Sequence, residues 1–216
     1  MENKDLFEIK DGTLVKYDGT RVTIPDGVKA IDSLAFGFND RVVEVYIPAS
    51  VEEIGWSAFS CCHDLKRIVF GDNSSLKKIG AFAFSGCRGI EEVRLPESLE
   101  TIGGDVFANC VNLKKVEFEG NRLECIWKGA FSGCTNLRDI VIPEGVSTIG
   151  IDAFKNCDNL TTIAIPSTVT EIGNGAFKKC DNLTDVHFGG SDTCWADVKI
   201  GRGNKRLECS NKHFIG

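Results

Sequence analysis

The stretch that decides the fold is Ile142–Leu160, which reads IPEGVSTIGIDAFKNCDNL. The next unit, Ile165–Leu183, reads IPSTVTEIGNGAFKKCDNL and keeps almost every apolar position. The same order of apolar residues returns through most of the 216-residue chain, with a period of about 23 residues. A fixed period in this range is typical of a solenoid, in which each repeat forms one coil and stacks on its neighbours.

One phenylalanine marks each coil, and the spacing between these residues shows where a coil is longer. The seven are separated by 23, 25, 23, 24, 23 and 23 residues. The two longer intervals contain insertions at 71–75 and 119–122, each in place of a short proline turn. All five prolines occupy one repeat position, and because proline cannot donate to a sheet ladder, they predict where strands end. The marker residues are Phe36, Phe59, Phe84, Phe107, Phe131, Phe154 and Phe177.

The local pattern predicts two kinds of element in each coil. Before each proline position, apolar residues alternate with polar ones, as in Leu160, Ile163 and Ile165, which is typical of a strand with one buried face. The segment 152–156 is short and compatible with a single helical or 3₁₀ turn. We therefore expect a parallel sheet on one side of the solenoid and short helical or 3₁₀ turns on the other.

The pattern L-x-x-I-x-I-P-x-x-V-x-x-I-G-x-x-A-F-x-x-C-x-x-L resembles the BspA-like class of leucine-rich repeats, and it runs from Val22 to Phe188. The resemblance implies an α/β fold, a right-handed leucine-rich-repeat solenoid with seven repeats at 22–188. It also implies an N-terminal cap hairpin at 1–21 and a C-terminal cap at 189–216, because terminal coils would otherwise expose apolar faces and open edges. The resemblance further implies a role in non-enzymatic recognition, frequently in adhesion on bacterial cell surfaces.

Charge and hydropathy limit the classes of partner. The formal net charge is −6 and no cluster of lysine and arginine stands out, so a nucleic-acid partner is disfavoured. No apolar run reaches the roughly 18–20 residues that cross a bilayer, so we expect no membrane span. The start, Met1–Phe7, lacks the features of a secretory signal, which favours the cytoplasm. The family resemblance instead implies a cell-surface or secreted protein, and both locations stay open.

The ten cysteines are interpreted as mainly structural. Six lie three residues after a marker phenylalanine, and Asn39 takes that position in the first coil, which indicates a buried corner that also needs a hydrogen bond. Parallel side chains on neighbouring strands have a poor geometry for disulfides. Cys194 and Cys209 are either free or paired across the C-terminal cap. No cysteine–histidine spacing typical of a zinc site is present, so we expect neither a metal nor a cofactor.

No catalytic motif stands out, and we predict a protein that is not an enzyme. The sequence has no G-x-S-x-G, G-x-x-x-x-G-K-[ST] or H-E-x-x-H motif. Cys62–His63 resembles a nucleophile beside a base, but Cys62 belongs to the buried ladder and His63 is interpreted as an exposed corner residue. A thiol-dependent enzyme or redox sensor is a third hypothesis, behind a binding module and a scaffold.

The strand face is the predicted site of partner binding. One outward column contains Glu44, Arg67, Glu92, Lys115 and Asp139, and we expect ion pairs between neighbours: Glu44 with Arg67, Arg67 with Glu92, and Glu92 with Lys115. These side chains either keep a sheet face soluble or bind a protein, for which arginine and tyrosine are typical anchors. The candidate partner-binding residues are Tyr46, Arg67, Arg94, Lys115, Glu117, Asp139 and His187.

Two tryptophans interrupt the repeat. Trp127 replaces a glycine that most coils share, and Trp56 directly follows that glycine. Each either covers the core or offers an exposed anchor, and we favour core cover. The sequence as a whole predicts a protein-binding or adhesion module that uses the strand face and has an unidentified protein partner. The alternative is a structural scaffold segment of a larger surface protein, and the oligomeric state stays open.

Overall fold

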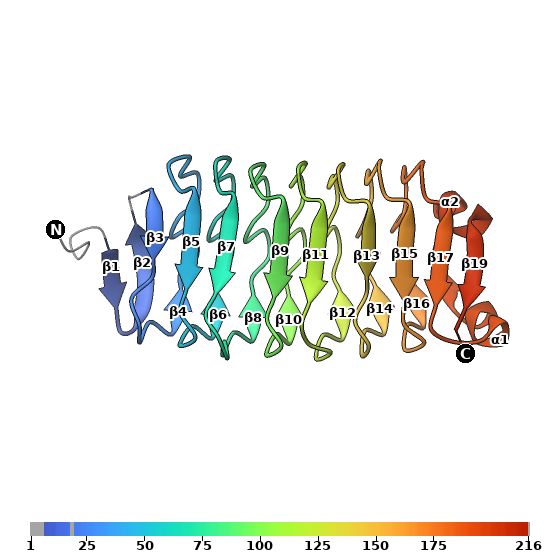
Figure 1. The fold of residues 1–216 in the computed structure, drawn as a ribbon, viewed down its shortest axis with the longest axis horizontal. Helices are drawn as coiled ribbons and strands as arrows, with labels where there is room; N and C mark the ends of the chain where they lie inside the picture. The colour runs from blue at the N-terminus through green and yellow to red at the C-terminus, as the bar shows by residue number, and fades with distance from the viewer. Residues whose placement is uncertain (1–6, 18–19, 216) are drawn as a thin grey trace.

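The computed structural model describes residues 7–17 and 20–215. It is an elongated solenoid of parallel strands, in which a row of long strands lies in front of a row of two-residue strands (Figure 1). The start, Met1–Phe7, in which we expect no secretory signal, lies outside the described residues except for Phe7. The long strands are β3 (Arg21–Thr23), β5 (Glu44–Ile47), β7 (Arg67–Phe70), β9 (Glu92–Leu95), β11 (Lys115–Phe118), β13 (Asp139–Val141), β15 (Thr162–Ile165), β17 (Asp185–Phe188) and β19 (Asn211–Phe214).

The short strands form the second row of parallel pairs, and other elements lie at the two ends. An antiparallel hairpin, β1 (Phe7–Lys10) and β2 (Thr13–Tyr17), joins the second row through the pairing of β2 with β4. Two five-residue helices, α1 (Asp192–Ala196) and α2 (Lys205–Cys209), lie near the C-terminal end (Figure 1). The short strands are β4 (Ala30–Ile31), β6 (Glu53–Ile54), β8 (Lys78–Ile79), β10 (Thr101–Ile102), β12 (Cys125–Ile126), β14 (Thr148–Ile149), β16 (Glu171–Ile172) and β18 (Lys199–Ile200).

The core is a column of stacked rings, as the repeat requires. The seven marker phenylalanines are all buried, and each ring stacks on the next with centroid distances of 4.5–5.7 Å and interplanar angles of 7–10°. Offset stacks at this distance add to the hydrophobic gain from burial. The alternating residues before each proline position face this column, so that in β15 Ile163 and Ile165 are buried while the two residues between and before them are not.

The expected helical turns on the opposite side are not confirmed. Residues 152–156 form tight turns, in which the N–H groups of Asp152, Phe154 and Asn156 donate to carbonyls of the next coil. A helix would direct those groups to carbonyls of its own segment. Asp152 and Asn156 also have positive φ values of 55° and 59°, a conformation that no right-handed helix contains. Stacking between coils therefore overrides the local helix compatibility.

The ladder of long strands is interrupted twice. The pairs run β3–β5–β7, then β9–β11, then β13–β15–β17–β19, so it is open between β7 and β9 and between β11 and β13. The second row stays paired from β4 to β10, behind the first opening. The insertion 71–75 follows β7 and the insertion 119–122 follows β11, so each longer coil coincides with an opening. The described residues include no helix long and apolar enough to cross a bilayer.

At the C-terminal end, the side chain of Asn204 makes hydrogen bonds that the turn of a further coil would otherwise make. In the upstream coils, the marker phenylalanine N–H donates to a carbonyl of the next coil, as from Phe154 to Ala176. In the last coil, Phe177 N–H donates instead to Asn204 Oδ1, 2.9 Å away. Asn204 is buried, and its Nδ2 donates to the carbonyls of Gly173 and Gly201 at 3.0 and 2.7 Å. The Asn204 amide therefore provides the hydrogen-bond partners that the last turn lacks from a following coil.

Candidate functional site

The strand register places the predicted columns as the sequence indicates. Glu44 lies opposite Arg67 in the pair β5–β7, and Glu92 lies opposite Lys115 in the pair β9–β11. Arg94 lies opposite Glu117, in the second column. Because successive side chains of a strand point to opposite faces, these residues share the outer face of the long strands.

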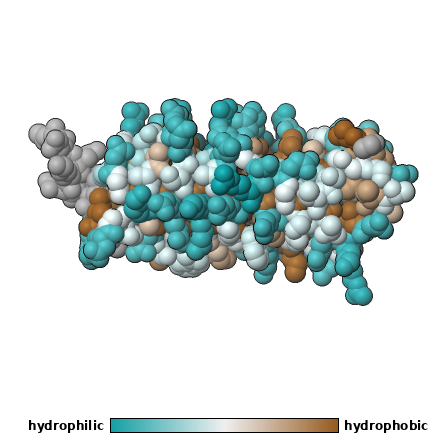
Figure 2. Space-filling view, turned by 90° about the horizontal axis from the view of Figure 1, so that it is seen from below, coloured by the Kyte–Doolittle hydropathy of each residue, from teal (hydrophilic) through white to brown (hydrophobic). Residues whose placement is uncertain are grey.

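A groove of about 1250 Å³ lies on this face, where the ladder opens between β7 and β9. Four of the seven candidate residues line it: Arg67 from β7, Arg94 from β9, and Lys115 and Glu117 from β11. The two insertions contribute to the same groove, through residues 71–74 and through Glu119 and Arg122. Figure 2 looks at the molecule from below, at the edge where the long strands end, and hydrophilic side chains gather there over the middle of the molecule. We call this the strand-face groove.

Glu117 organises the cations of the strand-face groove. Arg94 Nε lies 2.7 Å from Glu117 Oε2, and Lys115 forms an ion pair with Glu117 Oε1. The hydrogen bond from Lys115 is the main cause of a lowered pKa for the Glu117 carboxyl, with Arg94 adding to it. The same bond raises the pKa of Lys115. Two cations thus share one carboxylate, which leaves the triad with a net positive charge.

Only one of the three expected ion pairs in the first column forms. Arg67 Nη1 lies 3.8 Å from Glu44 Oε1, as predicted. The predicted pair of Arg67 with Glu92 is wrong, because it would cross the opening between β7 and β9. The predicted pair of Glu92 with Lys115 is also wrong, since Lys115 turns along its own strand to Glu117. The opening of the ladder therefore changes the charge pattern that a regular sheet would have.

The other three candidates lie on the same face but do not line the groove. Tyr46 lies on β5, opposite Val69 of β7. Asp139 is on β13, beyond the second opening of the ladder. His187 is near the C-terminal end, where its ring stacks on that of His213 at a centroid distance of 4.6 Å.

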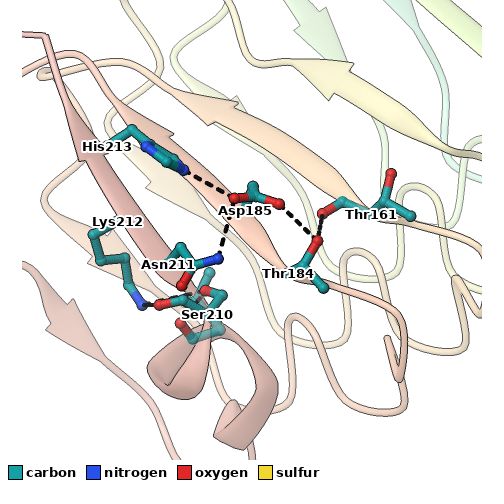
Figure 3. Close-up of polar contacts among 8 residues, drawn as sticks. Thr161, Thr184, Asp185, Ser210, Asn211, Lys212 and His213 are labelled. Atoms are coloured by element: carbon teal, nitrogen blue, oxygen red, sulfur yellow. Dashed lines mark hydrogen bonds and ion pairs between the residues drawn. The ribbon is translucent and has the colours of Figure 1, made fainter.

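Sequence reasoning missed a polar cluster around Asp185 (Figure 3). His213 Nε2 lies 2.9 Å from Asp185 Oδ1, and Asn211 Nδ2 donates to the same oxygen at 3.3 Å. Thr184 Oγ1 donates to Asp185 Oδ2 at 2.7 Å. These hydrogen bonds, the one from His213 first, lower the pKa of Asp185 to about 2. The cluster joins β17 to β19, a strand that lacks the repeat motif; the only sequence signal was the interval of 26 residues from Asp185 to Asn211.

We expect Asp185 to make the C-terminal end sensitive to acid. Its stabilising effect is fully present above the unfolded pKa of 3.8 and is lost as the pH falls through 3.8 towards the folded pKa of about 2. The difference in unfolding free energy between wild type and Asp185→Asn should therefore be largest near neutral pH and should be mostly lost once the pH reaches about 2. Thermal or urea unfolding of both proteins across this range measures it. A difference that does not change with pH would refute this role for the carboxylate.

The ladder cysteines are buried and each donates a hydrogen bond. Cys62 Sγ lies 3.0 Å from the carbonyl of Phe36, and Cys110 Sγ lies 3.2 Å from that of Phe84. Burial raises the pKa of Cys62 and of Cys110 to about 12, which leaves little of the reactive thiolate near neutral pH. The structural role proposed for these thiols, with a hydrogen bond at the corner, is confirmed. Cys194 and Cys209 are exposed and free rather than paired.

The adjacent residues Cys62 and His63 have different environments. The thiol points into the core, while His63 Nδ1 lies 2.7 Å from Asp40 Oδ1 at the surface. Among the residues that the structure describes, no group of three or more histidine, cysteine or acidic side chains has the geometry to hold a metal ion.

The expectation that both irregular tryptophans cover the core is wrong. Trp56 is 50% exposed and Trp127 is 51% exposed. Trp56 makes an edge contact with Phe82, at 6.4 Å between ring centroids. Both side chains project from the turn side because the core behind them is already filled by the phenylalanine column.

Comparisons with known proteins agree with this architecture. A model of the BspA type leucine-rich repeat region matches six copies over residues 7–121 and 116–193. The solved leucine-rich repeat protein TpLRR of T. pallidum is 27% identical, with a TM-score of 0.60; the match covers 90% of this chain and 92% of that one.

A solved leucine-rich repeat protein from Bacteroides ovatus is 25% identical, with a TM-score of 0.59; the match covers 90% of this chain and 64% of that one. No curated protein matches the sequence. The family match spans most of the chain and rests on the same repeat that builds the phenylalanine column. The chain belongs to the BspA-type leucine-rich repeat family.

Proposed function

We propose that this protein is a non-enzymatic protein-binding or adhesion module that uses its strand face, with the strand-face groove as the contact site. The observation that carries the proposal is the convergence of Arg67, Arg94, Lys115 and Glu117 on one groove of about 1250 Å³. Solenoids commonly bind partners across such extended surfaces. The fold alone does not fix the function, so the proposal depends on this site.

The charges of the groove define how it would bind. Arg67 and Arg94 have side chains that are mostly exposed, and arginine is among the residues that contribute most to protein interfaces. The carboxylate of Glu117 fixes the Arg94 side chain in place, which reduces the entropy lost on binding. Acidic side chains also line the groove, among them Glu91, Glu92 and Glu97, so the groove carries charges of both signs. A partner that presents carboxylates to Arg67 and Arg94, and cations to the acidic side chains, fits this arrangement.

The experiment compares two triple variants with the same change in charge. Arg67→Ala/Arg94→Ala/Lys115→Ala removes cations from the groove, and Lys77→Ala/Lys199→Ala/Lys205→Ala removes the same number elsewhere, so both have a net charge of −6 − 3 = −9. Partners are captured with wild-type protein from cells of the source and from host extracts, and are then titrated against all three proteins.

We expect the groove variant to bind a captured partner at least tenfold more weakly, which corresponds to about 1.4 kcal/mol. The control variant should stay within about threefold of wild type. Equal binding by all three proteins would contradict the groove as the site. Circular dichroism at increasing temperature checks that both variants are folded.

The alternative is a structural scaffold segment of a larger surface protein. Lys212 opposes one form of it, in which further coils stack on β19. This residue takes the position on β19 that the buried Val186 has on β17. Its Nζ donates to the carbonyl of Ser210 at 2.6 Å and lies 5.9 Å from the centre of the Trp195 ring. A charged side chain that points inward is a known protection of a sheet edge against further strands. The C-terminal edge is therefore built to end the solenoid.

A further inference from the structure

Large apolar side chains project from the turn side of the first three coils, those of Phe36, Phe59 and Phe84. This turn side lies behind the long strands in Figure 1 and is distinct from the strand-face groove. The projecting residues are Leu34, Phe38, Trp56 and Phe82, which are 45%, 71%, 50% and 39% exposed. We call them the apolar turn patch.

The backbone makes these residues unusual. Every coil has two turn positions with positive φ, two residues before and two residues after the marker phenylalanine. Later coils fill them mostly with glycine, asparagine or aspartate, such as Gly129, Gly133 and Asn156, which tolerate this conformation. Leu34, Phe38 and Phe82 occupy the same positions with φ values of 61°, 62° and 59°. A bulky side chain there is sterically unfavourable, and its exposure to water is unfavourable as well.

The residues between the patch members are small and uncharged. They are Ser33, Gly37, Ser57, Ser60, Cys61, Ala81, Ser85 and Gly86. In the last three coils, those of Phe131, Phe154 and Phe177, the same positions contain four lysines and one acidic residue, Asp152. Lys155 is paired with Asp152 at 3.2 Å, while Lys128, Lys178 and Lys179 are exposed. Two exposed apolar side chains, Trp127 and Ile151, lie among these lysines. The turn side is thus apolar and uncharged at one end, and cationic with fewer apolar side chains at the other.

We propose that the turn side docks on an anionic lipid bilayer, with the apolar turn patch inserted at the interface and the lysines against the headgroups. Tryptophan and phenylalanine favour the boundary between water and hydrocarbon, and lysine near the surface adds attraction to anionic lipids. Separate side chains that project from turns can enter a fluid surface without a matching pocket for each one. The charge complementarity of the lysine end selects an anionic surface rather than a neutral one.

The negative net charge of the whole protein does not oppose this docking at physiological salt. Charges separated by more than about 8 Å are largely screened there, so the lysines closest to the membrane dominate. Docking through the turn side would leave the strand-face groove open on the opposite side, so the inference stands independently of the proposed function.

The test is flotation with vesicles of phosphatidylcholine alone and of phosphatidylcholine with phosphatidylglycerol in equal parts. The patch variant is Phe38→Asn/Trp56→Ala/Phe82→Gly, which leaves the charge unchanged. Each new residue occurs at the same turn position in another coil, at Asn109, Ala81 and Gly129, so the variant should fold. A matched control, Tyr46→Ala/Val141→Ala, removes exposed apolar surface from the strand face.

We expect wild type and the control to float with the anionic vesicles and the patch variant to partition at least tenfold more weakly. Lys128→Gln/Lys178→Gln/Lys179→Gln should weaken binding to the anionic vesicles only. The proposal is overturned if wild type floats with neither kind of vesicle, if the patch variant binds as wild type does, or if the control loses as much binding as the patch variant. Folding of each variant is checked by thermal unfolding.

Discussion

Replacing Phe107 by alanine is expected to lower the free energy of unfolding by about 3–5 kcal/mol. The ring is buried in the middle of the column, 5.4 Å from Phe84 and 5.7 Å from Phe131 between centroids. Its removal leaves a cavity between two rings that face each other. Because a domain of ordinary stability has about 5–15 kcal/mol in total, this is a large fraction.

The cavity should also weaken the coupling between the two halves of the solenoid. Each coil contacts only its neighbours, so one defective interface can separate the unfolding of the coils before and after it. Urea unfolding followed by circular dichroism measures both effects, and a second transition is expected. Phe82→Ala is the control, because Phe82 is exposed on the turn side and should cost less than about 1 kcal/mol. Equal losses at the two positions would contradict the role of the ring column.

Asn204→Ala is expected to cost about 2–4 kcal/mol, although the side chain lies outside the repeats. Alanine would remove three hydrogen bonds and leave the N–H of Phe177 without its partner. The effect should be largest at the C-terminal end, where hydrogen exchange of the Phe177 amide would become faster.

A matched control for this prediction is Asn136→Ala. Asn136 is a surface residue whose side chain bonds to the asparagines of neighbouring coils. Its Nδ2 donates to Asn112 Oδ1 at 3.3 Å. Its replacement should stay within about 0.5 kcal/mol of wild type. If Asn204→Ala lowers the free energy of unfolding as little as the control does, then the last turn does not depend on the hydrogen bonds of this amide.

The sequence predicted those features that repeat from coil to coil. The buried cysteine corners and the strand register follow from positions that recur with one period, so each further coil tests the same inference again. The phenylalanines showed that period, whereas the stacking of their rings is a finding of the structure. The pairing of Glu44 with Arg67 followed in the same way, because β5 and β7 are regular neighbours.

The features that the sequence did not predict arise from contacts between coils. Residues 152–156 are locally compatible with a helix, but every second N–H group, from Asp152 to Asn156, bonds to the next coil. Reasoning from a single coil does not include those bonds. The groove depends on where the ladder opens, and the inserted residues alone do not tell which strands separate. Asn204 and Asp185 act at the C-terminal end, where the repeat motif no longer guides the alignment.

The chain therefore presents two different surfaces on one rigid core, a charged groove on the strand face and an apolar patch on the turn side. The groove is the basis of the proposed function, and two of its cations, Arg94 and Lys115, are held by Glu117. The measurement that tests this claim most directly is calorimetric titration of a captured partner against Arg67→Ala/Arg94→Ala/Lys115→Ala and the control triple variant. Affinity at least tenfold weaker for the groove variant, with the control unchanged, is the predicted result. Equal affinity for the two variants would contradict the strand-face groove as the binding site.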